Sequence, residues 1–311
     1  MHDFHPDVIY SQLSSLGLVR LVEGLARETG VPVVLHFMDD WPTTLYRSGL
    51  LAGHLRGRLG RELGALLDRA ALLMVISDDM ARAFKGRYGH DFMTFHNALD
   101  LGEWVSVRRT SWAPGHPFEI LYAGSVNIAN EAGILDVARA TKALASDGMD
   151  VRLVLLTAST TRPVAVSLDG LAHVNVLPAI PHAEMPARLA SADLLVLPLD
   201  FEERAQAFAR FSMPTKTVEY MASGTPTLVY APADNAVSRY AAEERWGHVV
   251  GTRSLTALTT ALRLLAENPA ERERLGKRAV ELASARHDAG PVREAFRAAL
   301  ESIVSRPGTA R

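Results

Sequence analysis

A lysine and a glutamate stand three residues apart near the start of a predicted helix. Ser212 and Pro214 are residue types typical of a helix start, and Gly224 is typical of a helix end. Because a cation stabilises the positive end of a helix poorly, Lys216 suits an anion that docks there. One turn later, Glu219 could accept hydrogen bonds from sugar hydroxyls. The pair therefore indicates a site for a phosphate next to a sugar; the alternative is a surface ion pair.

A second candidate for phosphate contact is the turn at Gly124 and Ser125. It follows a predicted strand and precedes a helix that begins near Asn130. A glycine at this position allows close approach of the backbone to a pyrophosphate, and the helix start favours the anion. Glycine is common in such turns, so this signal is weak by itself. The sequence contains neither G-x-G-x-x-G nor G-x-x-x-x-G-K-[ST], which leaves nicotinamide-dinucleotide and P-loop interpretations without support.

Two adjacent carboxylates, Asp39 and Asp40, end another predicted strand, three and four residues after His36. Open α/β sheets bind ligands at the carboxyl ends of their strands. We favour Asp39 over His36 as a functional residue, while a loop turn before Trp-Pro remains the alternative. Further along, Ser77 is interpreted first as a helix N-cap and Asn97 as a turn residue.

Short apolar runs alternate with amphipathic stretches throughout the chain, which predicts a parallel sheet in each of two α/β domains. The strands are expected at residues 8–11, 31–36, 71–77 and 92–96, and then at 118–124, 151–157, 174–180, 194–198 and 227–230. The helices are expected near 16–29, 48–69, 78–88, 130–145, 183–191, 213–223, 235–244 and 254–267.

The Pro/Gly-containing stretch 106–117 is the best candidate for a linker between these domains. The predicted boundaries are therefore 1–112 for the first domain and 113–285 for the second. Residues 286–311 are expected to form a C-terminal helix, for which packing back on the first domain is left open.

Composition narrows the classes of protein. The 311 residues are 48% hydrophobic and 22% charged, with a formal net charge of −2, so the chain can build two cores and has no basic half typical of a nucleic-acid binder. The chain contains no Cys, which excludes disulfides and thiol chemistry and agrees with a cytoplasmic location. No spacing typical of a metal site is present, so we expect no metal.

The whole string Pro-Thr-Lys-Thr-Val-Glu-Tyr-Met-Ala-Ser-Gly-Thr-Pro at 214–226, followed by a predicted strand, resembles the donor-binding segment of GT-B glycosyltransferases. The most similar family is the retaining glycosyltransferase family four. Residues 183–198 resemble the helix and strand that precede the donor site in this family. Further similar segments lie in the family's order at 76–80, 96–100 and 120–125, so that the resemblance covers roughly residues 7–285.

The resemblance implies an α/β fold of two Rossmann-like, doubly wound domains that face each other across a cleft. It implies transfer of a sugar from a nucleotide-diphosphate donor to an acceptor with retention. Neither an obligatory metal nor a cofactor other than this co-substrate is implied. Carried over to this chain, Lys216 would stabilise the leaving diphosphate and Glu219 would hold donor hydroxyls. The remaining donor-side positions are Thr215, Gly124, Ser125 and Ile180, and the acceptor-side positions are Asp39 as a catalytic residue and Asp40.

The chain also departs from the family's pattern. Phe211 stands at the position of the first of two glutamates, and Ser125 stands where many members have an arginine. Asn130 and Glu131 follow where those members have a lysine, and Met38 occupies the histidine position of the acceptor loop. These departures leave two alternatives open: a sugar-nucleotide epimerase or hydrolase on the same fold, and a non-catalytic binding or partner subunit.

The partners implied are a nucleotide-sugar donor and an acceptor that is a sugar, a lipid or a small molecule, with no nucleic acid. A peripheral membrane contact is left open. About four strands precede the linker, whereas the resemblance implies six or seven. We therefore expect the first domain to lack its opening strands, which would leave a sheet edge open to self-association.

Overall fold

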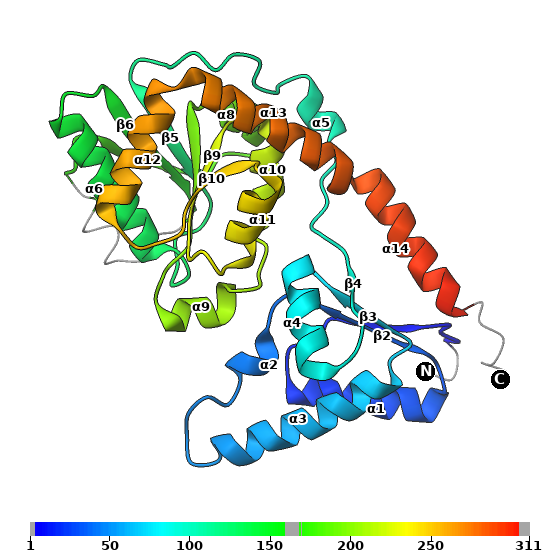
Figure 1. The fold of residues 1–311 in the computed structure, drawn as a ribbon. Coiled ribbons are helices and arrows are strands. Elements are labelled where there is room, and N and C mark those ends of the chain that lie inside the picture. Colours follow the sequence, from blue (N-terminus) through cyan, green and yellow to red (C-terminus); the bar gives the residue numbers. More distant parts are fainter. Residues whose placement is uncertain (1–3, 159–167, 169, 305–311) are drawn as a thin grey trace. The chain divides into compact units, whose positions relative to one another are not determined.

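The structure is a computed structural model that describes residues 4–158, 168 and 170–304. Its internal contacts divide the chain into two α/β units (Figure 1). The first unit comprises the described residues of Met1–His96, Arg210–Ser212 and Gly290–Arg311, and the second comprises those of Asn97–Ala209 and Met213–Ala289. Each unit is built on a parallel sheet, as the alternation of apolar runs and amphipathic stretches predicts.

In the first unit, the described residues form a four-stranded parallel sheet in the order β1-β2-β3-β4. Its strands are β1 (Ile9–Ser11), β2 (Val33–Phe37), β3 (Leu72–Val75) and β4 (Met93–Thr94). Its helices are α1 (Leu16–Thr29), α2 (Trp41–Thr44), α3 (Ala52–Arg69), α4 (Asp78–Tyr88) and, from the end of the described chain, α14 (Ala289–Val304).

The C-terminal helix α14, red in Figure 1, completes the core of this first unit. Ala299 and Ile303 of α14 pack with Val34, Met74 and Phe95 from the sheet strands and the residues that follow them. Burial of these apolar side chains is the main force that holds a distant segment of the chain against the sheet.

Local sequence signals fix several helix ends of the first unit. Ser15 caps α1 by accepting a hydrogen bond from Leu18 N, and Gly30 ends it with a φ of 69°. Ser77 caps α4, as predicted, by accepting from Met80 N at 3.2 Å. Gly89 ends α4 with a φ of 77°, a conformation that glycine adopts without strain.

The second unit holds a six-stranded parallel sheet in the order β10-β9-β8-β5-β6-β7. Its strands are β5 (Phe118–Ala123), β6 (Val151–Thr157), β7 (Val174–Pro178), β8 (Leu194–Pro198), β9 (Thr227–Tyr230) and β10 (Gly247–Val250). Its helices are α5 (Gly102–Val105), α6 (Glu131–Ser146), α8 (Met185–Ser191), α9 (Glu203–Ala209), α10 (Lys216–Ser223), α11 (Ala236–Glu244), α12 (Leu255–Glu267) and α13 (Pro269–Arg286), with a short 3-10 turn at His182–Glu184.

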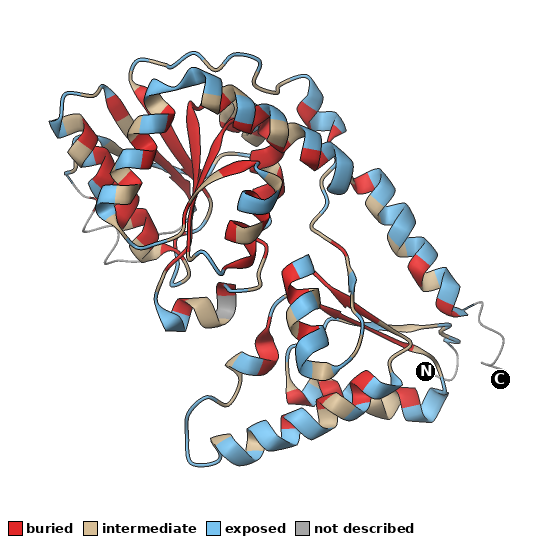
Figure 2. Cartoon of the chain, viewed as in Figure 1, coloured by how far each residue is buried: buried red, intermediate tan, exposed pale blue. Residues whose placement is uncertain are grey.

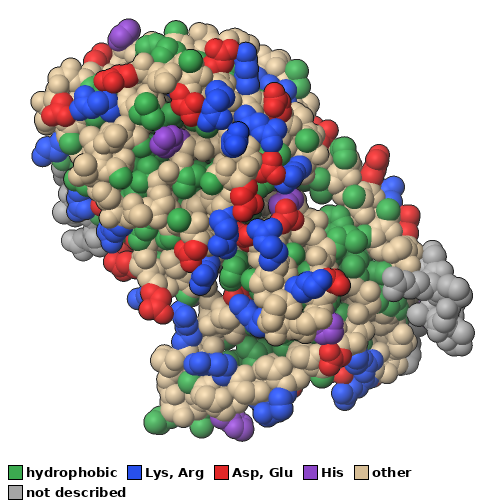
Figure 3. Space-filling view, viewed as in Figure 1, with side chains coloured by type: hydrophobic (Ala, Val, Ile, Leu, Met, Phe, Trp, Pro, Cys, Tyr) green, Lys and Arg blue, Asp and Glu red, His purple; other side chains and the backbone are tan. Residues whose placement is uncertain are grey.

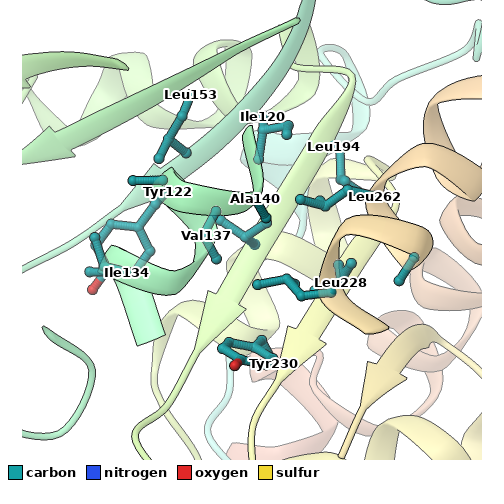
Figure 4. Packing of buried hydrophobic residues seen from close by; sticks show 14 of the residues in the cluster. Ile120, Tyr122, Ile134, Val137, Ala140, Leu153, Leu194, Leu228, Tyr230 and Leu262 are labelled. Carbon is teal, nitrogen blue, oxygen red and sulfur yellow. The ribbon is translucent and has the colours of Figure 1, made fainter. Parts of the chain in front are cut away.

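The central strands of this sheet are buried, as Figure 2 shows in red. Their side chains form one large core with those of α6 and α12, and Figure 4 shows part of it. The apolar runs of these strands show little alternation because helices flank the central strands of such sheets.

The boundary between the units lies earlier than the sequence predicted. It falls after His96, not at 112, and the chain passes back into the first unit after Ala289. Residues 97–112 belong to the second unit because they bond to it: Arg109 N donates to Ser223 O, and Trp112 Nε1 donates to Gly224 O. A contact between distant segments, and not a change of composition, sets the boundary.

Candidate functional site

Lys216 is the first residue of α10, and its ammonium reaches the carboxyl end of β5. Nζ donates a hydrogen bond to the hydroxyl of Tyr122 at 2.7 Å and lies 4.1 Å from the centroid of the same ring. A Cβ on Gly124 would clash with Nζ and with Cε of Lys216. Gly124 also has a φ of 141°, where other residues are strained. The glycine therefore opens the space that the ammonium occupies.

The helix that carries Lys216 begins later than predicted. Ser212 is not its N-cap: α10 starts at Lys216, and Thr215 precedes it without a side-chain capping bond. The backbone N–H of Thr217 donates instead to Pro214 O. The predicted end at Gly224 is confirmed, with a φ of 72°. Lys216 thus stands in the first turn of a short helix, with its amine turned toward β5.

The hydroxyl of Tyr122 is the centre of the hydrogen-bond network around Lys216. It accepts from Lys216 Nζ and from Asn130 Nδ2, at 2.7 and 2.8 Å, and donates to Ser125 O at 2.7 Å. Asn130 Nδ2 also donates to Ser125 O at 3.1 Å. Tyr122 is 1% exposed, so these partners replace water for a buried phenol.

Burial sets the electrostatics of this site. It lowers the pKa of Lys216 to about 8, while Glu219 acts in the opposite direction. Burial also raises the pKa of Glu219, against the influence of His182 and Lys216, and the pKa of Tyr122. The site therefore holds a desolvated ammonium whose charge an arriving anion would stabilise.

A carboxylate from another part of the chain, which the sequence did not suggest, bonds to the start of α6. Asp200, 4% exposed and just beyond the end of β8, accepts a hydrogen bond from Ala132 N at 3.2 Å. Glu131 N and Ile134 N donate to Asn127 O and Asn130 O. Partners within the chain therefore take the Glu131 and Ala132 N–H groups of this first turn. That this helix start favours a phosphate stays a prediction.

Strand order explains which other donor-side candidates lie near Lys216. Strands β5 and β8 are neighbours, so the turn at Gly124 and the segment after β8 share one edge of the sheet. Ser125 and Thr215 are exposed there, and Glu219 is half-buried. Ile180 follows β7, which β6 separates from β5, and its side chain is half-buried.

The sequence did not single out three residues near Lys216 as functional candidates. Tyr122 lies within the segment 120–125 that resembles the family, and Asn130 stands where many members have a lysine. The third is Tyr220, on α10, whose hydroxyl accepts from Ala123 N at 2.9 Å and so ties α10 to β5. A tyrosine within an apolar strand looks like a core residue, and the sequence carried no signal for its hydrogen bonds.

The acceptor-side candidates lie in the first unit and have different surroundings. The carboxylate of Asp40 is buried and accepts two hydrogen bonds from Arg87, at 2.6 and 2.9 Å. This pairing gives Asp40 a structural role and leaves its predicted acceptor contact without support. Asp39 is exposed at the end of β2. His36 is buried in β2, with Nδ1 2.7 Å from the hydroxyl of Tyr10, and burial lowers its pKa.

Three further positions named from the sequence have definite partners. Ser77 Oγ donates to Phe211 O at 3.1 Å, in addition to its capping role. The ring of Phe211, which stands where the family has a glutamate, lies 5.6 Å from the guanidinium carbon of Arg210. Asn97 does more than form a turn, because its Nδ2 donates to Met213 O at 2.8 Å.

Two general features bear on function. No group of three or more His, Cys, Asp or Glu side chains among the described residues could hold a metal ion. None of the described helices combines the length and the apolar character that crossing a membrane requires.

The two units, each built on a parallel sheet, agree with the fold that the resemblance to GT-B glycosyltransferases implied. Residues 117–268 match the sequence model of the family described as "Glycosyl transferases group 1". The chain is thus a nucleotide-sugar-dependent glycosyltransferase with the GT-B fold, and its group 1 domain lies in the second unit. Lys216, Glu219 and Gly124 all fall within the matched residues.

Solved structures agree on the fold. Sucrose-phosphate synthase from Thermosynechococcus elongatus superimposes with a TM-score of 0.74 at 15% identity, over 96% of this chain and 73% of that one. HepE from Anabaena, in complex with UDP and glucose, gives 0.69 at 16% identity, over 95% and 78%. The α,α-trehalose 6-phosphate synthase from Burkholderia multivorans gives 0.68 at 15% identity, over 99% and 74%. No curated protein matches the chain by sequence.

Proposed function

We propose that the chain moves a sugar from a nucleotide-diphosphate donor to a hydroxyl-bearing acceptor, and that Lys216 stabilises the diphosphate as it leaves. The observation that carries this proposal is the Lys216 ammonium at the Gly124 turn, within the segment that matches the family. The solved complexes of HepE with UDP and glucose, with UDP and with UDP-glucose support a nucleotide-sugar donor.

The chemistry that Lys216 would perform follows from where charge develops. As the bond from the anomeric carbon to the diphosphate breaks, negative charge grows on the leaving oxygen. A desolvated ammonium interacts more strongly with this charge than an ammonium in water would. The arriving diphosphate in turn raises the pKa of Lys216 from about 8, so that the amine stays protonated during the reaction.

Further details of the reaction belong to the same proposal. Glu219, half-buried one turn after Lys216, would accept hydrogen bonds from donor hydroxyls, with the ribose as the first candidate. Ser125 and Thr215 would contact the phosphates, and Ile180 would pack on the base. Asp39 would act on the acceptor side. Transfer would retain the anomeric configuration, which NMR of the product's anomeric proton can test.

The experiment for the proposed function measures binding of nucleoside diphosphates and their sugars by thermal shift and calorimetry. For the diphosphate that stabilises the wild type most, we expect Lys216→Met to weaken binding at least tenfold, since a charge-assisted hydrogen bond contributes about 1.5–3 kcal/mol. Lys142→Met, at an exposed lysine of α6, is the matched control and should bind like the wild type. Equal affinity of Lys216→Met and the wild type would remove Lys216 from the site.

The departures from the family's pattern favour one second candidate, a non-catalytic binding subunit. Ser125 and Phe211 stand where relatives carry a cation and a carboxylate. This alternative predicts tight diphosphate binding without turnover on any acceptor. An epimerase or hydrolase would instead release epimerised or free sugar without an acceptor, which chromatography of the same incubations detects.

A further inference from the structure

We propose that Tyr122 is the positioning residue for the Lys216 ammonium, and that Asn130 together with the carbonyl of Ser125 orients the tyrosine hydroxyl for this role. The inference rests on the proposed function of Lys216 and assigns how the chain holds its amine in place. Four residues of one unit carry it, through three hydrogen bonds to a single buried oxygen.

The hydroxyl of Tyr122 has no remaining bonding capacity. A phenol has one proton and two acceptor positions. The proton goes to Ser125 O, one acceptor position takes Asn130 Nδ2 and the other takes Lys216 Nζ. Because the first two partners fix the direction of the O–H bond, the remaining lone pair can point only at Lys216. The amide of Asn130 is fixed in turn, since its Oδ1 accepts from Asn127 N at 2.9 Å.

The surroundings of the ammonium explain why Lys216 needs an oriented hydrogen-bond acceptor. A lysine side chain loses rotamer entropy when it is fixed, so a fixed ammonium needs a partner that favours one position. The groups that face Lys216 are the Tyr122 ring and hydroxyl, the turn at Gly124, and Glu219 on the same helix. The hydroxyl of Tyr220, also nearby, is engaged with Ala123 N. Tyr122 therefore supplies an oriented acceptor, and its ring a face that attracts cations.

The departures from the family's pattern give this arrangement its importance. Where many relatives place an arginine and a lysine after the first strand of this domain, this chain has Ser125, Asn130 and Glu131. Asn130 instead donates to Tyr122 through its side chain, whereas Ser125 accepts through its backbone carbonyl, which any residue would supply. The side chain at position 130 thus serves to hold Lys216.

Two variants that shift the Lys216 pKa in opposite directions test the inference. Tyr122→Phe removes the acceptor, so the charged amine loses stabilisation and its pKa falls. Asn130→Asp cannot donate to the tyrosine and adds a carboxylate nearby, so the pKa of Lys216 rises. The midpoint of the Lys216 titration is expected at about pH 8 in the wild type. We expect it to fall by at least half a pH unit in Tyr122→Phe and to rise by at least as much in Asn130→Asp. Shifts of the same sign, or none, would overturn the inference.

The measurement is an NMR titration of the lysine 13Cε resonances in the ligand-free protein. The Lys216 resonance is assigned as the one that is missing from the spectrum of Lys216→Met. Tyr230→Phe is the matched control: its buried hydroxyl, on β9, donates to Asp136 Oδ2 at 3.2 Å, away from Lys216. It should leave the Lys216 midpoint unchanged. If Tyr122→Phe does not fold, Asn130→Ala removes only the donor to the hydroxyl, and its midpoint must still differ from that of the wild type.

A second arm separates this inference from the proposed function. The affinity for the nucleoside diphosphate is measured from pH 6.5 to 9.5 in the same variants. Midpoints that shift without any effect of Lys216→Met on affinity would support the positioning role and refute the diphosphate role. The opposite result is a loss of affinity in Lys216→Met with the Lys216 midpoint unchanged in Tyr122→Phe and Asn130→Asp. It would support the diphosphate role and refute the positioning role.

Discussion

Lys216 combines a functional charge with a cost in stability. Its pKa falls to about 8 from 10.5 because burial disfavours the charged form. The unfolded chain therefore binds more protons than the folded chain between these two values, and stability rises with pH across this window. Below pH 8 the folded protein carries the full penalty, which at 1.36 kcal/mol per pKa unit amounts to at most about 3 kcal/mol.

We therefore expect Lys216→Met to be more stable than the wild type at pH 7, although it binds diphosphate less well. The difference should shrink as pH rises from about 8 to 10.5, because the wild type loses its buried charge there. Thermal unfolding at pH 7 and at pH 9.5 measures it. A variant less stable than the wild type at pH 7 would contradict the burial cost.

Glu219 offers a second test at the scale of the residue. Since it would bind donor hydroxyls, Glu219→Gln should weaken binding of a nucleoside diphosphate about tenfold, the loss of a charged hydrogen bond, and leave inorganic pyrophosphate nearly unaffected. Calorimetry measures the affinity of Glu219→Gln and of the wild type for each of the two ligands. Equal losses for the two ligands would argue against contact with the ribose.

At the scale of elements, the site depends on how closely β5 and α10 approach each other. Gly124 provides the space, and the hydroxyl of Tyr220 fastens α10 to the backbone of Ala123. The approach joins segments 94 residues apart in sequence, the separation between Tyr122 and Lys216. The Gly124 turn thus controls where the ammonium stands.

Gly124→Ala should consequently displace Lys216 and weaken diphosphate binding at least tenfold. Gly148→Ala is a matched control, because Gly148 also has a positive φ, of 87°, but its Cβ would meet open space. Both variants carry backbone strain of about 1 kcal/mol or more, and only Gly124→Ala should lose affinity in calorimetry. Similar affinities of the two variants would show that the space at Gly124 is not required.

At the scale of the whole molecule, one surface of the first unit could make the peripheral membrane contact that the sequence left open. Leu50 is fully exposed and Leu51 is 66% exposed, directly before α3. Arg47 and Arg61 are exposed on either side of this pair in sequence. In Figure 3, a few hydrophobic and basic side chains lie at the lower left, where the chain enters α3 in Figure 1. Exposed leucines in a segment that also carries exposed arginines are suited to an anionic lipid surface.

We expect the chain to co-sediment with vesicles that contain phosphatidylglycerol and not with pure phosphatidylcholine. Replacing both Leu50 and Leu51 with Ser should reduce the bound fraction at least threefold, because the apolar part of the contact is lost. Leu264→Ser, at a leucine of α12 that is 44% exposed, is the control and should bind as the wild type does. Absence of binding to anionic vesicles by the wild type would refute the prediction.

The sequence by itself determined the features that depend on neighbouring residues. Alternating apolar and amphipathic segments predicted two parallel α/β units, and Ser77 and Gly224 marked helix ends correctly. The motif around Lys216 and Glu219 predicted the group 1 match. Such signals survive in one sequence because short-range sterics, capping and periodic burial act within a few residues.

Only the tertiary structure decided which side chains contact each other. Asp200 reaches the start of α6, and Arg87 engages Asp40, 47 residues away. Tyr122, which resembles a core residue in sequence, holds the ammonium of Lys216. Packing and buried hydrogen bonds join segments distant along the chain, and a local pattern encodes no partner for a side chain that the fold brings to it from another strand or helix.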